Sequence, residues 1–146
     1  MKERVFEAVT VEKQLIENRW VEFFTQGMQY RNTAEGSLKR PEIFKPDIIY
    51  NVAAMAIEKI LMAVFSKHGQ LPYSNTLSAM AGEAKEILAF DETLVSDMER
   101  MDRMQMICHE ESIFCEDMKV TDVPFFLDVM KRVFDKSEAY INQAGQ

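Results

Sequence analysis

The 146-residue chain has few cysteines, few glycines and almost no strand pattern, and each scarcity argues against a class of structure. Cys108 and Cys115 are the only cysteines, and we expect both to remain reduced thiols without assigned chemistry. The five glycines are scattered, which argues against a phosphate-binding loop or a dinucleotide fingerprint. Sustained apolar-polar alternation and Asn-Gly or Asp-Gly turns are lacking, so the sequence predicts no sheet.

The chain also has only two histidines, His68 and His109, too few for a three-histidine metal site. Helical bundles often hold two metal ions through Glu-x-x-His pairs, but Phe65 and Met106 stand where those glutamates would be. We therefore predict no metal site and no cofactor. His68 is expected in the last turn of a helix, where a positive charge suits the helix dipole.

The charge pattern and the start of the chain indicate a cytoplasmic protein. Glu3, Arg4 and Glu7 interrupt any signal peptide, and the longest apolar runs are broken by Glu or Lys, so we expect no membrane span. A net charge of −7 opposes non-specific attachment to RNA or anionic lipid. One probable loop collects basic residues, either as a small positive patch or as a solvated linker: Arg31, Lys39, Arg40 and Lys45.

Apolar residues recur at helical spacing along most of the chain, which predicts one all-α domain over residues 1–146, folded as an up-and-down bundle of about five helices. The second expected helix is apolar almost all round, so it should be central. Capping residues and proline or glycine punctuation set the expected ranges, namely Thr10–Arg31, about Pro46 to Gly69, a short helix carrying Leu77 to Leu88, Glu92 to about Glu110, and a last helix from Thr121 or Asp122.

The fourth expected helix is crowded with methionine, a flexible side chain that suits both irregular cores and adaptable interfaces. Met98, Met101, Met104 and Met106 cannot all point in one direction. Some of them should therefore meet a second subunit or solvent. We expect a homodimer, although core filling is the alternative for most of the four.

The same helix carries Arg103 and His109, which are candidate catalytic residues. Six residues of helix turn through about 600°, so the two positions lie about 120° apart around the axis. They form one site only if the helix distorts or a second subunit contributes. Glu58 lies in the most apolar helix, where an ionised carboxylate needs a partner. We expect Arg103 to pair with Glu58. Both are candidate ligand-binding residues, and we assign Glu58 a structural role rather than a catalytic one.

Three stretches resemble the HEPN family, the higher-eukaryote and prokaryote nucleotide-binding domains. AAMAIEKILMAVFSKHGQLPYSNTLSAM (53–80) is similar to the central segment of the family, and VPFFLDVMKRVFDKSEAYI (123–141) to its closing helix. Arg103 and His109 match the loose R-x4-6-H motif of the family. Two positions depart from the pattern: Met104 replaces the polar residue that often follows the motif arginine, and Asn75 replaces a histidine.

The resemblance implies a helical dimer and two possible functions. In family members that are metal-independent ribonucleases, the motif histidine takes the 2′-hydroxyl proton and the arginine holds the scissile phosphate, roles that would fall to His109 and Arg103. Other members bind a nucleotide or a partner without strong catalysis, often beside a nucleotidyltransferase. We favour this second function, because an acidic surface fits poorly with gripping long RNA. The alternatives are an endoribonuclease, such as the toxin of a toxin–antitoxin pair, and a helical-bundle interaction protein with no small-molecule site.

Overall fold

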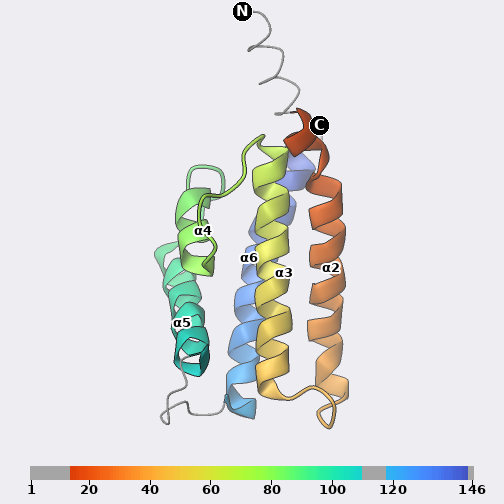
Figure 1. Cartoon of the computed structure of the whole chain (residues 1–146), viewed down its shortest axis with the longest axis vertical. Coiled ribbons are helices and arrows are strands. Elements are labelled where there is room, and N and C mark those ends of the chain that lie inside the picture. The colour runs from red at the N-terminus through yellow and green to blue at the C-terminus, as the bar shows by residue number, and fades with distance from the viewer. Residues whose placement is uncertain (1–13, 110–117, 145–146) are drawn as a thin grey trace, which may run out of the picture.

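The computed structural model describes residues 14–109 and 118–144, with side chains for 14–105 and 118–143 (Figure 1). Within these ranges it contains five α-helices and no strand, so the predicted all-α bundle is confirmed. The helices are α2 (Trp20–Gly36), α3 (Pro46–Lys67), α4 (Leu77–Ala84), α5 (Glu92–His109) and α6 (Val123–Ala144). Single 3₁₀ turns follow α2 (η1, Ser37–Lys39) and precede α6 (η2, Val120–Asp122).

Capping residues set three of the helix ends where the sequence predicts them. The Thr76 hydroxyl accepts from the Ala79 amide at the start of α4, and the Asp91 carboxylate accepts from the Leu94 amide at the start of α5. Gly69, which follows α3, has φ of 84°. This left-handed conformation favours glycine and ends the helix.

The first expected helix is wrong at its C-terminal end. We expected it to stop at Arg31, but α2 continues to Gly36, and the expected loop Asn32–Lys45 is correspondingly shorter. Arg31 pairs with Glu35 one turn later, a spacing that stabilises a helix. At the other end, Arg19 breaks the helical run between residues 14–18 and α2.

The helices run in two directions, and long-range contacts show which ones share a direction. Tyr50, near the start of α3, donates from its hydroxyl to the Met101 carbonyl, near the end of α5, so these helices are antiparallel. The amide of Leu77, at the start of α4, meets Asp102 of α5. Helix α4 is therefore antiparallel to α5 and runs in the same direction as α3, because residues 68–76 lead the chain back along the bundle (Figure 1).

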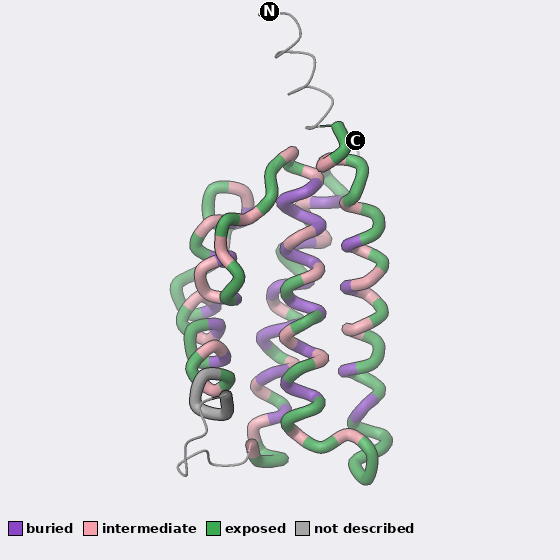
Figure 2. The backbone as a smooth tube through the Cα atoms, in the orientation of Figure 1, coloured by how far each residue is buried: buried purple, intermediate pink, exposed green. Residues whose placement is uncertain are grey.

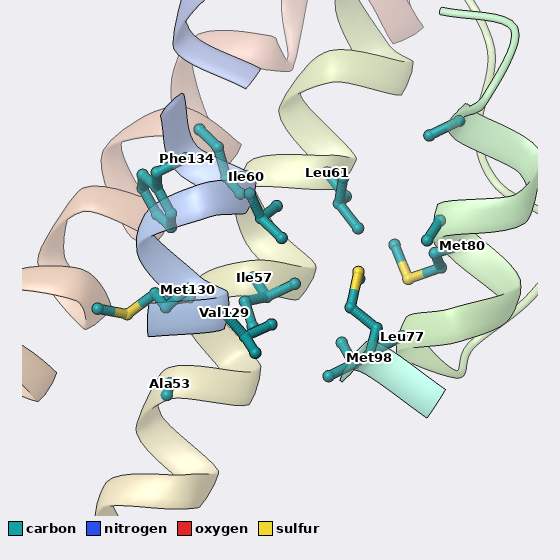
Figure 3. Close-up of a cluster of buried hydrophobic side chains, with 14 of the residues drawn as sticks. Ala53, Ile57, Ile60, Leu61, Leu77, Met80, Met98, Val129, Met130 and Phe134 are labelled. Atoms are coloured by element: carbon teal, nitrogen blue, oxygen red, sulfur yellow. The ribbon is translucent and has the colours of Figure 1, made fainter. Parts of the chain in front are cut away.

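Helix α3 is the central helix, as predicted, and its buried side chains contact several neighbours. Figure 3 shows Ile57 near Val129 and Met130 of α6, and Leu61 facing Met80 and Met98 across the core. On the α2 side the backbones approach closely at Gly27: a Cβ there would lie 3.3 Å from the Ile60 nitrogen.

By length and composition, α3 is also able to cross a membrane, with a mean hydropathy of 1.8 over its most apolar window. Length and composition alone do not decide whether a helix spans a membrane, so our expectation of no membrane span stays a prediction. A core helix meets the same criteria, and 56% of this window is buried inside the bundle. Figure 2 shows buried stretches of α3 alternating with intermediate and exposed ones along the helix.

Candidate functional site

Arg103 lies at the surface of α5. The apolar face of this helix is formed by Leu94, Met98 and Met101, all at most 2% exposed. Two residues of helix turn through about 200°, so Arg103 projects almost opposite to Met101. Its side chain is exposed, and within the described residues it has no hydrogen-bond or ion-pair partner. The guanidinium is therefore placed where an anionic ligand could reach it.

Asp102, the neighbour of Arg103, has a structural role that the sequence analysis missed. Its two carboxylate oxygens accept from the backbone amides of Leu77 and Ser78, at 3.1 and 2.9 Å. These amides belong to the first turn of α4, where backbone N–H groups lack partners within the helix and the dipole favours negative charge. Asp102 thus fastens α4 to α5. Its 25-residue separation from Leu77 leaves no local signal that could reveal the contact.

His109 is the last residue of α5, and its side chain lies outside the described residues. The helix is continuous from Glu92 to His109, with no break between Arg103 and His109. The backbone is therefore not unwound between the two positions. A shared site would need a bend of the helix or a second subunit.

Glu58 does not occupy the buried position that we inferred for it. It is exposed on α3, and among the described residues no ion pair joins it to Arg103. The inference failed because it treated a helix that is apolar on average as buried on every side. Water solvates the Glu58 carboxylate, so this residue needs no cationic partner inside the protein.

Two methionines of α5 lie inside the bundle. Met98 and Met101 are fully buried, and Met104 packs at the edge of the core. The Met106 side chain is outside the described residues. Met98 and Met101 therefore fill the core, as we expected for most of the four, and a partner contact by Met104 or Met106 stays a prediction.

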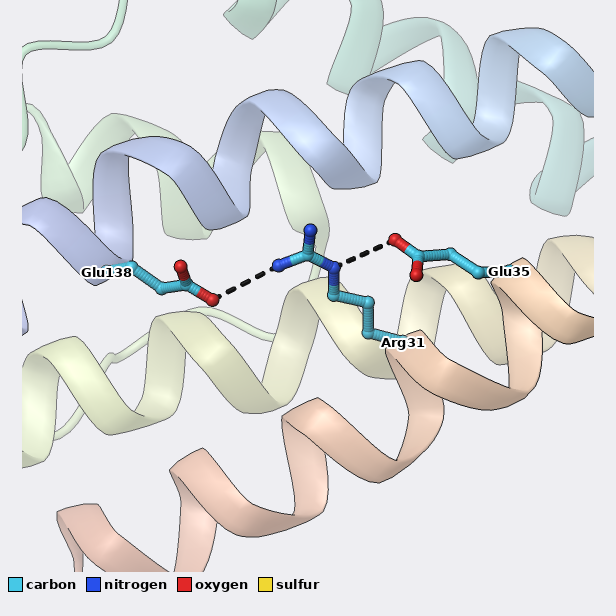
Figure 4. Close-up of polar contacts among 3 residues, drawn as sticks. All are labelled: Arg31, Glu35 and Glu138. Atoms are coloured by element: carbon cyan, nitrogen blue, oxygen red, sulfur yellow. Dashed lines mark hydrogen bonds and ion pairs between the residues drawn. The ribbon is translucent and has the colours of Figure 1, made fainter.

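The basic loop patch is smaller than the sequence suggests, because Arg31 is held elsewhere. Its guanidinium lies 2.9 Å from a Glu35 carboxylate oxygen and 3.1 Å from one of Glu138 (Figure 4). It also lies 5.0 Å from the centre of the Phe134 ring, a cation–π contact between α2 and α6. The remaining members of the patch are exposed: Lys39, Arg40 and Lys45.

Arg132 on α6 is a second arginine with a structural role. It pairs with Asp97 of α5 and lies 2.9 Å from Asp128 one turn earlier. Burial alone would lower the pKa of Arg132, but the hydrogen bond to Asp97 and the charge of Asp128 raise it above its ordinary value. Arg103 has no such carboxylate partners within the described chain.

The histidine at the end of α3 agrees with the structural role predicted for it. His68 is the C-cap of α3, and its Nδ1 lies 3.1 Å from the Tyr140 hydroxyl. Burial raises the pKa of Tyr140. Within the described ranges, His, Cys, Asp and Glu side chains form no group of three that could hold a metal ion.

Comparisons with known proteins give no match: no protein-family model matches this chain, nor does any curated protein or solved structure. The HEPN resemblance therefore rests on the residues quoted for it.

Proposed function

We propose that this chain is a HEPN-like, cytoplasmic protein that forms a homodimer and binds an anionic nucleotide or a partner protein through Arg103, without strong catalysis of its own. The observation that supports it best is the exposure of Arg103 beside Asp102. One residue fastens α5 to α4, while the next extends a guanidinium into solvent. Guanidinium binds phosphate with two parallel hydrogen bonds, which suits a nucleotide ligand. A nucleotidyltransferase is the partner that the family resemblance suggests.

The binding test measures ATP and a short RNA separately, with the parent protein and with Arg103→Ala. A guanidinium–phosphate contact is worth about 1.5–3 kcal/mol, so Arg103→Ala should weaken binding about tenfold or more. Arg103→Lys keeps the charge but loses the fork of donors, and should fall between the two. Lys136→Ala removes an exposed cation from α6 and serves as the matched control. Equal affinity of Arg103→Ala and the parent would contradict the proposal.

The endoribonuclease alternative assigns phosphate binding to Arg103 and proton transfer to His109. Imidazole titrates near neutral pH, so His109 has suitable chemistry for a general base. This alternative predicts RNA cleavage that His109→Ala abolishes while binding persists. Our proposal expects no RNA cleavage by the parent or by His109→Ala. The second alternative, an interaction protein with no small-molecule site, predicts that neither ATP nor RNA binds.

A further inference from the structure

One face of α3 carries apolar side chains that the described elements leave partly exposed. Ile48 and Met55 are each 39% exposed, and Met62 is half-buried. The three residues follow one another at seven-residue intervals, so they form a nearly straight line along the helix. We refer to Ile48, Met55 and Met62 as the α3 stripe.

The α3 stripe lies away from the neighbours that bury the rest of the helix. Ala56 and Ile60 approach α2 at Gly27, while Ile57 and Leu61 belong to the buried core. At 100° per residue, Met55 is rotated about 160° from Ile57, which places it almost opposite the core side. An apolar line of this regularity on an acidic protein is a surface suited to another helix.

Two charged residues flank the α3 stripe and indicate what can cover it. Glu58 is displaced about 60° to one side of Met55 and Lys59 about 40° to the other. When two copies of α3 pack in the same direction about a two-fold axis along the helices, opposite flanks meet. Each Glu58 then faces Lys59 of the other copy. An antiparallel pair would instead bring like flanks together, with Glu58 on the side of the second Glu58.

We propose that the α3 stripe is a self-association surface, on which a second copy of this chain packs its own α3 in parallel. The pairing deepens the proposed function, because it assigns the surface of the homodimer. Lys59 is available for it: its ammonium lies 5.7 Å from the centre of the Phe23 ring, a loose contact at the edge of α2. One helix per subunit buries less than a standard interface, so we expect dissociation in roughly the micromolar range.

Pairing through α3 separates the two copies of α5. Tyr50, which donates to the Met101 carbonyl of α5, is rotated about 140° from Met55 around α3, so α5 lies on the core side of α3, away from the α3 stripe. Arg103 stays exposed in such a dimer, and Arg103 of one subunit does not meet His109 of the other. The geometry therefore favours a binding protein over a nuclease whose site is shared between subunits.

Sedimentation equilibrium tests the surface, with each variant checked for its fold by circular dichroism. Met55→Lys places a charge in the centre of the α3 stripe and should weaken self-association about tenfold or more. Glu58→Lys and Lys59→Glu should each weaken it, and the double exchange should restore it. Lys136→Ala should leave it unchanged. A monomeric parent, or a dimer insensitive to Met55→Lys and to both charge variants, would overturn the proposal.

Disulfide trapping tests the direction of pairing, in a background with Cys108→Ser and Cys115→Ser. In a parallel pair each residue of the α3 stripe faces its twin, so Ile48→Cys, Met55→Cys and Met62→Cys should each form a covalent dimer on oxidation. An antiparallel pair centred on Met55 would link only that position, which would overturn the parallel arrangement. Lys136→Cys is the control and should not link.

A third set of measurements distinguishes self-association from lipid binding. It also distinguishes failure of the pairing from failure of the proposed function. If the parent floats with phosphatidylcholine vesicles and Met55→Lys does not, the α3 stripe is a lipid surface and the pairing is overturned. Arg103→Ala should self-associate like the parent, because Arg103 lies outside the surface. Loss of nucleotide binding in Arg103→Ala with an intact dimer therefore bears on the proposed function alone.

Discussion

Helices α3 and α5 both carry methionine, but α3 exposes Met55 whereas α5 buries Met98 and Met101. Helix α3 is apolar enough to resemble a membrane span, but it leaves Met55 39% exposed. Helix α5 is rich in charged residues, and its Met98 and Met101 are fully buried. The mean composition of a helix therefore does not tell which of its side chains are covered. The arrangement of its neighbours decides that.

The physical reason lies in where the neighbours attach. Helix α5 turns Leu94, Met98 and Met101 to one side, where they are buried, and it packs against α4 and α6. Helix α3 has apolar residues on nearly every side, and α2, α4 and α6 together cover only part of its circumference. The α3 stripe lies on the part that they leave partly exposed.

The largest effect should come from a buried methionine. Met98→Ala removes a fully buried side chain and leaves a cavity, which should lower the free energy of unfolding by about 2–5 kcal/mol. Met55→Ala, on the outward side of α3, should lower it by less than about 1 kcal/mol. Urea denaturation followed by circular dichroism, at concentrations below any self-association, measures both. Equal losses would contradict the contrast between the two helices.

A smaller effect should distinguish two adjacent residues of α5. Asp102→Ala leaves the Leu77 and Ser78 amides without their acceptor, and should lower the free energy of unfolding by about 1–2 kcal/mol. Arg103→Ala removes an exposed side chain and should change it by no more than about 0.5 kcal/mol. Hydrogen exchange at Leu77 and Ser78 should accelerate in the first variant only. Unchanged exchange would show that Asp102 does not hold α4.

The smallest effect concerns the turn before α4. The Glu83 carboxylate accepts hydrogen bonds from the Ser74 hydroxyl and from the Tyr73 amide, which lower its pKa below the ordinary value of about 4.5. Because the folded-state pKa is depressed, this contribution to stability is complete above about pH 4.5 and is lost as pH falls through the folded value. Thermal melts from pH 7 to 3 should show a small loss that Glu83→Gln lacks. An identical pH profile for the two proteins would refute this.

Much of the fold could be predicted because its signals are local. Helical periodicity gives the element type, and Thr76, Asp91 and Gly69 mark the helix ends through contacts within a few residues. The extension of α2 to Gly36 was missed because Asn32 was interpreted as the start of a loop. The Arg31–Glu35 pair, which supports that extension, was not considered.

The candidate site was harder to predict, because its contacts join distant segments. Asp102 meets α4 across 25 positions and Arg31 meets Glu138 across 107, and neither pairing has a local pattern. The burial of Glu58 was misjudged for the same reason: exposure depends on which helices surround α3. Arg103 remains the principal candidate for ligand binding, on a surface that the sequence could not describe.

The most direct test of the proposed function is the affinity of the parent and of Arg103→Ala for ATP and for a short RNA, compared at matched fold and oligomeric state. The proposal predicts measurable binding of at least one ligand by the parent, a loss of about tenfold or more on Arg103→Ala, and no loss on Lys136→Ala. Binding that is absent from the parent, or unchanged by Arg103→Ala, would contradict the assignment of Arg103 as the ligand-binding residue.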